Sequence, residues 1–171
     1  MPPSASSNTQ IAICGIGLRL PGGISNTLEY WELLVNGRDA KSRVDKERFN
    51  PDAFDDSLGG NLSIREQNGY FLSQDLGLFD PSFFSFSRKE AERCDPQQRL
   101  LLEVTRECLE DAGEVNYRGR PIGCYIGSFG STWLRLQNVD PQFPTNYLMA
   151  GMEDYMLSNR ISYEYDLAGP R

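Results

Sequence analysis

Two short apolar runs, one near the start of the chain and one in its second half, are typical of buried β-strands. The first is Ile11-Ala12-Ile13-Cys14, and the second covers residues 121–127. Each is bounded by glycine or proline, and continuous apolar runs of this length fit strands covered on both faces. We therefore predict strands at 11–14 and 121–127, followed by loops at 20–23 and 127–131.

Two stretches have the spacing and the end signals of helices. Residues 27–36 place four apolar side chains on one face (Leu28, Trp31, Leu34, Val35). Asn26 and Glu29 form a capping box at the start, and Gly37 suits the end. A shorter helix opens with the capping pair Ser87 and Glu90 and runs to about Arg93.

The strongest helical pattern covers residues 96–112. Asp95 is a good N-cap, Pro96 suits the first helical position, and Gln98 stands where a capping side chain reaches back. Gly113 suits the end of the helix. The predicted buried stripe is Leu101, Val104, Cys108, Leu109 and Ala112, and the predicted charged outer face is Arg99, Glu103, Arg106 and Glu110.

The remaining segments carry weaker patterns. Residues 38–80 have little periodicity, apart from an extended piece predicted at 69–72. Four phenylalanines crowd residues 79–86, and this density favours a place in the core over an interface. A last helical region is expected from about Tyr147 to Ser158, continuing towards Tyr165. Residues 1–9 are predicted to be a disordered leader.

Length and charge restrict the class of protein. The chain has 171 residues, 39% hydrophobic and 24% charged, which fits one globular domain at 10–171. A net charge of −7 argues against a nucleic-acid partner. The apolar runs are too short to span a membrane, and the N-terminus lacks a signal-peptide pattern. We expect a cytoplasmic protein with no membrane partner.

The cysteines and glycines give no catalytic or binding motif by themselves. Cys14, Cys94, Cys108 and Cys124 form no CxxC pair, and the chain contains no histidine, which argues against a metal site. We expect these thiols to be free and mostly buried, without disulfides. Gly15 and Gly17 lack the third glycine of a dinucleotide fingerprint, and residues 127–130 do not form a nucleophile elbow. Asn61 matches a glycosylation acceptor by chance.

Several segments in one order resemble the ketosynthase domain of type I polyketide synthases, closest to the fungal highly reducing ones. They comprise the opening segment 11–23, residues 30–34 and 37–40, residues 79–84, the DPQQRLLLEV block at 95–104 with its extension 108–113, and the closing segments 158–163 and 166–170. The resemblance implies a thiolase-like α/β fold, in which two similar halves form a five-layer α/β/α/β/α body. This chain would hold most of the N-terminal half, so its fold is expected to be incomplete.

The resemblance also implies a chemistry, which this chain does not carry. The family uses a cysteine in a Thr-Ala-Cys-Ser-Ser-Ser motif, with two histidines, to condense acyl and malonyl thioesters. The motif would follow Arg171, and Arg88 and Arg171 stand where the family has proline and serine. None of the four cysteines has the nucleophile's context. We therefore predict no catalytic, cofactor-binding or metal-binding residues and no cofactor.

The sequence favours the first of three hypotheses about function, and the other two stay open as alternatives. The first is a truncated ketosynthase fragment from a polyketide biosynthesis locus that is catalytically inactive alone. The second is a split subunit that complements a separately encoded remainder and so restores decarboxylative condensation. The third is a non-catalytic protein whose partner is an intact polyketide synthase.

Overall fold

The computed structural model describes residues 10–54, 64–130, 132–137 and 148–171. The predicted leader at 1–9 and Asn61 lie outside these ranges. The elements in chain order are α1 (Thr27–Val35), β1 (Ser42–Arg43), a 3₁₀ helix at Pro51–Phe54, β2 (Asn68–Gly69), α2 (Arg88–Arg93), α3 (Pro96–Asp111), α4 (Thr132–Gln137), α5 (Leu148–Met152) and α6 (Tyr155–Glu164).

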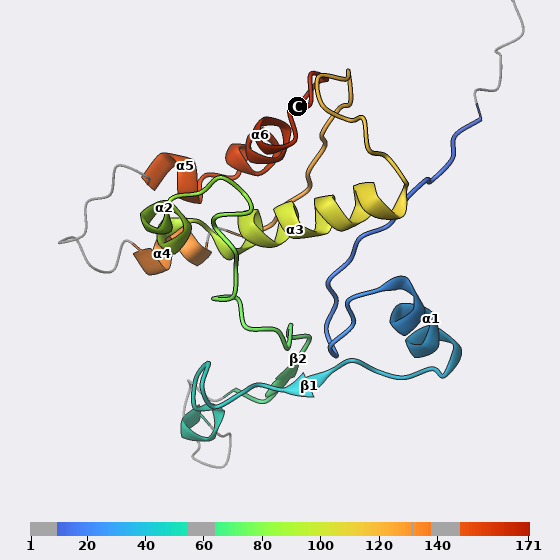
Figure 1. Ribbon diagram of the computed structural model, residues 1–171. Coiled ribbons are helices and arrows are strands. Elements are labelled where there is room, and N and C mark those ends of the chain that lie inside the picture. The colour runs from blue at the N-terminus through green and yellow to red at the C-terminus, as the bar shows by residue number, and fades with distance from the viewer. Residues whose placement is uncertain (1–9, 55–63, 131, 138–147) are drawn as a thin grey trace, which may run out of the picture.

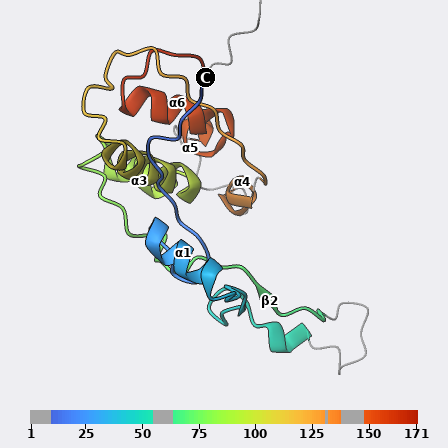
Figure 2. The same cartoon turned by 90° about the vertical axis from the view of Figure 1, so that its right-hand side faces the viewer.

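Helix α3 lies at the centre of a group of helices. Helix α6 packs against it, and α2, α4 and α5 lie near its N-terminal end (Figures 1 and 2). Its end signals act as predicted. Asp95 accepts a hydrogen bond from the Gln97 backbone N–H at 2.7 Å, and Pro96 occupies the first turn. Gly113 follows with φ at +66°, a left-handed conformation that glycine adopts without strain.

The predicted role of Gln98 is wrong, and the predicted buried stripe is confirmed only in part. Gln98 is buried and its side-chain oxygen accepts from the Cys94 thiol at 3.3 Å, while the Asp95 N–H donates to the Gly151 carbonyl at 2.7 Å. Leu102 is the fully buried leucine of α3, and the predicted stripe residues are only half-buried. Leu101 and Leu109 of the predicted stripe nevertheless pack against the core that contains Leu102.

The hydrophobic core combines α3 and α6 with the phenylalanine-rich segment. Phe84 and Phe86 are buried, and the Phe79 ring stacks on Phe84 with centroids 5.1 Å apart. Phe83 is exposed but touches Phe84 edge-on. The prediction that this segment belongs to the core is therefore confirmed for three of its four rings.

The two predicted buried strands do not form within the described residues. Residues 10–19 run as an extended trace past α3 (Figure 1), but Ile11 and Ile13 are 93% and 83% exposed. Residues 122–124 make backbone hydrogen bonds to 169–170 but no regular ladder. A strand requires a hydrogen-bonded neighbour along its length, and no described segment lies alongside 11–14 in that way.

The predicted N-terminal helix is confirmed as α1, although its apolar face is uncovered. The Asn26 side chain accepts a hydrogen bond from the Glu29 N–H at 3.0 Å. The Glu29 carboxylate accepts from the N–H of Ser25 at 2.8 Å, whereas a capping box would use the N–H of Asn26. All four residues of the apolar face are exposed.

Next along the chain, β1 and β2 pair antiparallel, with Ser42 opposite Gly69. The extended piece predicted at 69–72 is therefore shorter than expected and begins one residue earlier, at Asn68.

The C-terminal helical region is divided into α5 and α6 rather than continuous. The Gly151 carbonyl, which would accept from residue 155 in an unbroken helix, accepts from Asp95 instead at 2.7 Å. Arg160 of α6 then binds both neighbours, with an ion pair to Glu90 of α2 at 2.7 Å and a hydrogen bond to the Ala150 carbonyl at 3.3 Å. Helix α4 was not predicted. No helix in the described ranges is long and apolar enough to cross a membrane.

Candidate functional site: an apolar groove over helix α3

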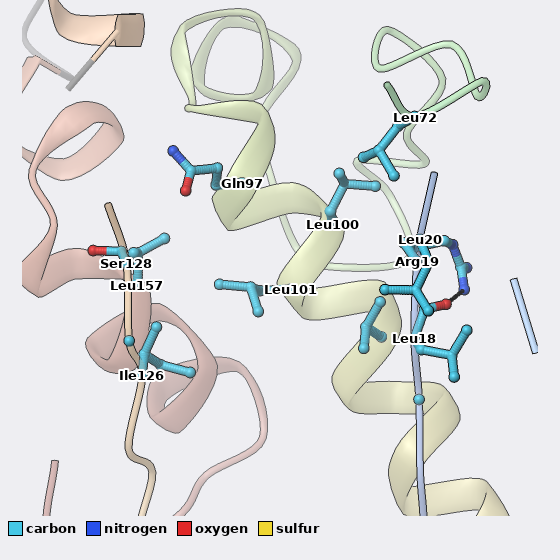
Figure 3. Close-up of a pocket in the computed structure, with 13 residues that line it drawn as sticks. Leu18, Arg19, Leu20, Leu72, Gln97, Leu100, Leu101, Ile126, Ser128 and Leu157 are labelled. Atoms are coloured by element: carbon cyan, nitrogen blue, oxygen red, sulfur yellow. Dashed lines mark hydrogen bonds between the residues drawn. The ribbon is translucent and has the colours of Figure 1, made fainter. Parts of the chain in front are cut away.

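The candidate functional site is an apolar groove of about 410 Å³ that lies over α3. Its floor is formed by Gln97, Leu100, Leu101 and Val104 of α3. One wall is the extended segment 17–20 and the other is the extended segment 126–128, with Leu72 and Leu157 completing the lining. Figure 3 shows the two walls on opposite sides of α3, with the leucines of the floor between them.

The chain at the start of the first wall lies directly on α3 because residues 15 and 17 are glycines. A Cβ on Gly15 would stand 2.3 Å from the Cys108 carbonyl oxygen, and a Cβ on Gly17 would stand 2.3 Å from that of Val104. Such distances exclude any side chain at either position. The Ile16 N–H donates to the Asp111 carboxylate at 2.9 Å, which fixes the segment to the end of the helix.

An ion pair holds the same wall further along. The Arg19 guanidinium binds the Glu107 carboxylate through both of its terminal nitrogens, and this hydrogen bonding raises the pKa of Arg19. Bidentate pairs of this kind combine charge with a fixed orientation. The absence of a dinucleotide fingerprint at Gly15 and Gly17 gave no indication of this role, because their contacts are with a helix about ninety residues later in the chain.

The segment that leads into the second wall, residues 124–126, alternates between buried and exposed side chains, as in a strand with one face on the core. Cys124 is buried and Ile126 packs against the core, whereas Tyr125 between them is 80% exposed. One backbone edge is occupied, since the Cys124 N–H donates to the Pro170 carbonyl at 2.8 Å and the Gly169 N–H donates to Ile122 at 3.2 Å. Gly169 is required there, because a Cβ would meet the Ile122 carbonyl carbon at 2.3 Å.

The two buried thiols, Cys94 and Cys124, are not activated nucleophiles. Burial raises the pKa of Cys94 to about 12 and also raises that of Cys124, so both stay protonated at neutral pH. Cys14 is exposed, which corrects the prediction that it is buried; all four cysteines are free. Because only the thiolate attacks, neither buried cysteine is ready for acyl transfer.

The groove is lined mainly by apolar side chains. Within the described ranges no group of three or more metal-ligating side chains comes together, and the whole sequence contains no histidine. That this chain has no catalytic, cofactor-binding or metal-binding residue stays a prediction.

Comparison with known proteins places this geometry in a family. The family model described as "Beta-ketoacyl synthase, N-terminal domain" matches residues 8–171. The highly reducing polyketide synthase g433 of a Fusarium species is 53% identical over 161 residues, which are 94% of this chain and 6% of that protein. The highly reducing polyketide synthase ntnH of a Nectria species is 50% identical over 170 residues, 99% of this chain and 7% of that protein.

Solved structures agree on the fold. The ketosynthase from module 6 of the bacillaene synthase of Bacillus subtilis 168 has a TM-score of 0.71 and 28% identity, covering 93% of this chain and 25% of that chain. An oxazolomycin ketosynthase domain from Streptomyces albus has a TM-score of 0.67 and 28% identity. The fold is thus thiolase-like, and the structure corresponds to part of a ketosynthase domain. The chain belongs to the beta-ketoacyl synthase N-terminal domain family, and its fungal relatives are highly reducing polyketide synthases.

Proposed function

We propose that this chain supplies the N-terminal part of a polyketide synthase ketosynthase, that it performs no condensation by itself, and that it acts once a complementary remainder of the domain covers it. The observation that carries the proposal is the uncovered apolar groove over α3, between the two extended walls. A groove with an apolar floor is stabilised when another polypeptide segment excludes water from it.

Inactivity of the chain alone is supported by the chemistry that acyl condensation requires. The ketosynthase reaction loads an acyl group on a thiolate and needs basic or electrophilic groups to stabilise the charges that develop. Here the raised pKa of Cys94 keeps its thiol protonated, and histidine, the usual partner, is missing from the sequence. The groove and its surroundings offer hydrophobic contacts instead.

Complementation by a remainder is supported by how much apolar surface is left open. The α1 face, the outward side chains of both groove walls and the floor of the groove are exposed or half-exposed. The matched region makes up 25% of the bacillaene ketosynthase chain, so the other part of such a domain is large enough to cover these surfaces. Unpaired extended edges favour pairing with another segment.

Co-expression tests this proposal. The chain is produced with a tagged remainder of the ketosynthase domain from a fungal highly reducing synthase, and the expected result is a stable one-to-one complex that is acylated on the cysteine of the remainder. Leu18→Asp and Leu100→Asp place a charge in the groove and should abolish the complex. Leu136→Asp, an exposed leucine on α4 outside the groove, is the matched control and should leave it intact.

Two outcomes would contradict the proposal. One is a complex that tolerates both groove variants as well as the control does. The other is co-purification with a full-length synthase but not with the remainder, which would favour a non-catalytic protein that binds an intact synthase.

A further inference from the structure

Helix α1 presents an apolar face that no described part of the chain covers. Leu28, Trp31, Leu34 and Val35 are 75%, 65%, 51% and 63% exposed. The helix lies outside the group of helices around α3 (Figures 1 and 2), and none of its residues lines the groove. The chain therefore exposes two apolar surfaces at once, a helix face and a groove, and exposed apolar patches mark sites of association.

The turn before α1 holds this helix away from the groove of its own chain. The Leu20 N–H donates to the Ile24 carbonyl at 2.9 Å, and Ile24 is buried. A terminal nitrogen of Arg19 also donates to the Ser25 carbonyl at 3.4 Å. Because Arg19 and Leu20 belong to the groove wall, these contacts tie the chain before α1 to that wall. Movement of α1 into its own groove would strain them, whereas the α1 of another copy enters without disturbing them.

The helix face and the groove match in length and in character. The floor residues 97–104 and the apolar positions 28–35 cover the same length of helix, about 10 Å at a rise of about 1.5 Å per residue. Figure 3 shows the leucines of the floor between walls on opposite sides of α3, so a helix that enters between the walls meets α3 along its length. An amphipathic helix that lays its apolar face in an apolar groove is a common mode of recognition.

The area of one such contact is sufficient for a specific interface. The four exposed side chains of α1 offer roughly 500 Å² of apolar surface, on a scale where one aromatic side chain buries about 150–250 Å². The groove that covers them loses a similar area. One contact therefore buries roughly 1,000 Å², which is the lower bound for a specific protein–protein interface.

We propose that the groove over α3 binds helix α1 of a second copy of this chain. The contact joins a helix on one copy to a groove on the next, so copies add in series as well as in pairs. It occupies the groove until another polypeptide displaces the helix. The proposal rests on the open groove and not on the proposed function, because it concerns the chain in the absence of any complementary remainder.

Analytical ultracentrifugation of the full chain tests the proposal. The wild-type chain should self-associate at micromolar concentration into dimers or larger species. Trp31→Asp removes the helix face and Leu100→Asp removes the groove, so each variant alone should need at least about tenfold more protein to associate. Leu136→Asp, an exposed leucine of α4 outside both surfaces, is the matched control and should associate like the wild type.

An equimolar mixture of the two variants gives the sharpest result. Trp31→Asp keeps an intact groove and Leu100→Asp keeps an intact helix, so the mixture allows one contact and should form a one-to-one heterodimer that grows no further. Circular dichroism checks that each variant keeps its helices. If either loses them, the mixture is made instead from Leu28→Asp and Leu18→Asp, which lie on the same two surfaces.

Three outcomes would overturn the proposal. They are a wild-type chain that stays monomeric, self-association that survives both charged variants, and a mixture of folded variants that forms no heterodimer. Binding of a ketosynthase remainder is measured in a separate experiment, so failure of that binding leaves these results unchanged, and the reverse also holds.

Discussion

The hydroxyl of Tyr165 donates a hydrogen bond of 2.6 Å to the backbone carbonyl of Leu102, and both residues are buried. This bond joins the end of α6 to the middle of α3. The Tyr117 ring packs edge-on against Tyr165 with centroids 5.7 Å apart. Burial raises the pKa of Tyr165 well above its usual value, so the phenol remains a donor throughout the neutral range. This contact between α3 and α6 lies away from the open groove, since none of Leu102, Tyr117 and Tyr165 lines it.

Replacing Tyr165 with phenylalanine should weaken this pairing. The substitution keeps the ring and removes one buried hydrogen bond, which we expect to lower the local opening free energy of α3 by about 1 kcal/mol. Hydrogen exchange of the α3 amides measures it. Tyr163→Phe, on the same helix but 80% exposed, is the control and should change nothing. Equal effects of the two substitutions would mean that the bond to Leu102 contributes no stability.

Removing the N-cap of α3 should lower the local opening free energy of this helix by a similar amount. Asp95→Ala deletes the acceptor for the Gln97 N–H, and loss of an N-cap typically costs about 1 kcal/mol. Asp154 stands at the N-cap of α6 without a side-chain capping bond, so Asp154→Ala is a matched control that should leave α6 nearly unchanged. Exchange rates in the first turns of the two helices give the comparison. An unchanged first turn of α3 in Asp95→Ala would refute the role of the cap.

The four thiols should react in an order set by burial. We expect an alkylating reagent to modify Cys14 first and Cys94 last, because Cys14 is exposed and Cys94 is fully buried. Peptide mass spectrometry after timed labelling gives the order, and labelling in denaturant should remove the difference. Fast modification of Cys94 under native conditions would show that α2 and α3 do not enclose it.

The raised pKa of Cys94 also predicts the direction in which the free energy of unfolding changes with pH. The pKa of Cys94 is raised from 9.0 to about 12, so between these values the unfolded thiol loses its proton while the folded one keeps it. The unfolded state then binds fewer protons, and the stability contributed by Cys94 is full below pH 9 and falls as pH rises toward 12.

Local signals predicted the capped helices α1, α2 and α3 well, and the long-range arrangement poorly. Asn26, Ser87 and Asp95 act as caps because a cap depends on atoms within three residues of it. Residues 11–14 and 121–127 were expected to be strands, but strand formation depends on a neighbour that may be distant in sequence. Gly15 and Gly17 illustrate the same limit: their role is to let the chain touch α3, about ninety residues later, and nothing local specifies that contact.

The uncovered surfaces predict poor autonomous folding. The apolar face of α1 and the groove are open to solvent in the chain alone, and net stability is a small difference between large terms. Expression of the chain by itself should give aggregates or a loosely packed species that binds a hydrophobic dye, and the co-expressed remainder should suppress the dye signal. A monodisperse monomer with a sharp thermal transition and no dye binding would contradict this expectation.

An acyl-transfer assay on the purified chain tests the central claim most directly. The chain is incubated with acyl and malonyl thioesters, alone and with the complementary remainder, and condensation product is measured against a control without protein. We predict no product from the chain alone, because Cys94 and Cys124 remain protonated and the sequence contains no histidine. Product should appear with the remainder present, beyond what the remainder makes by itself. Turnover by the chain alone above the control, whether or not it survives replacement of all four cysteines, would contradict the account.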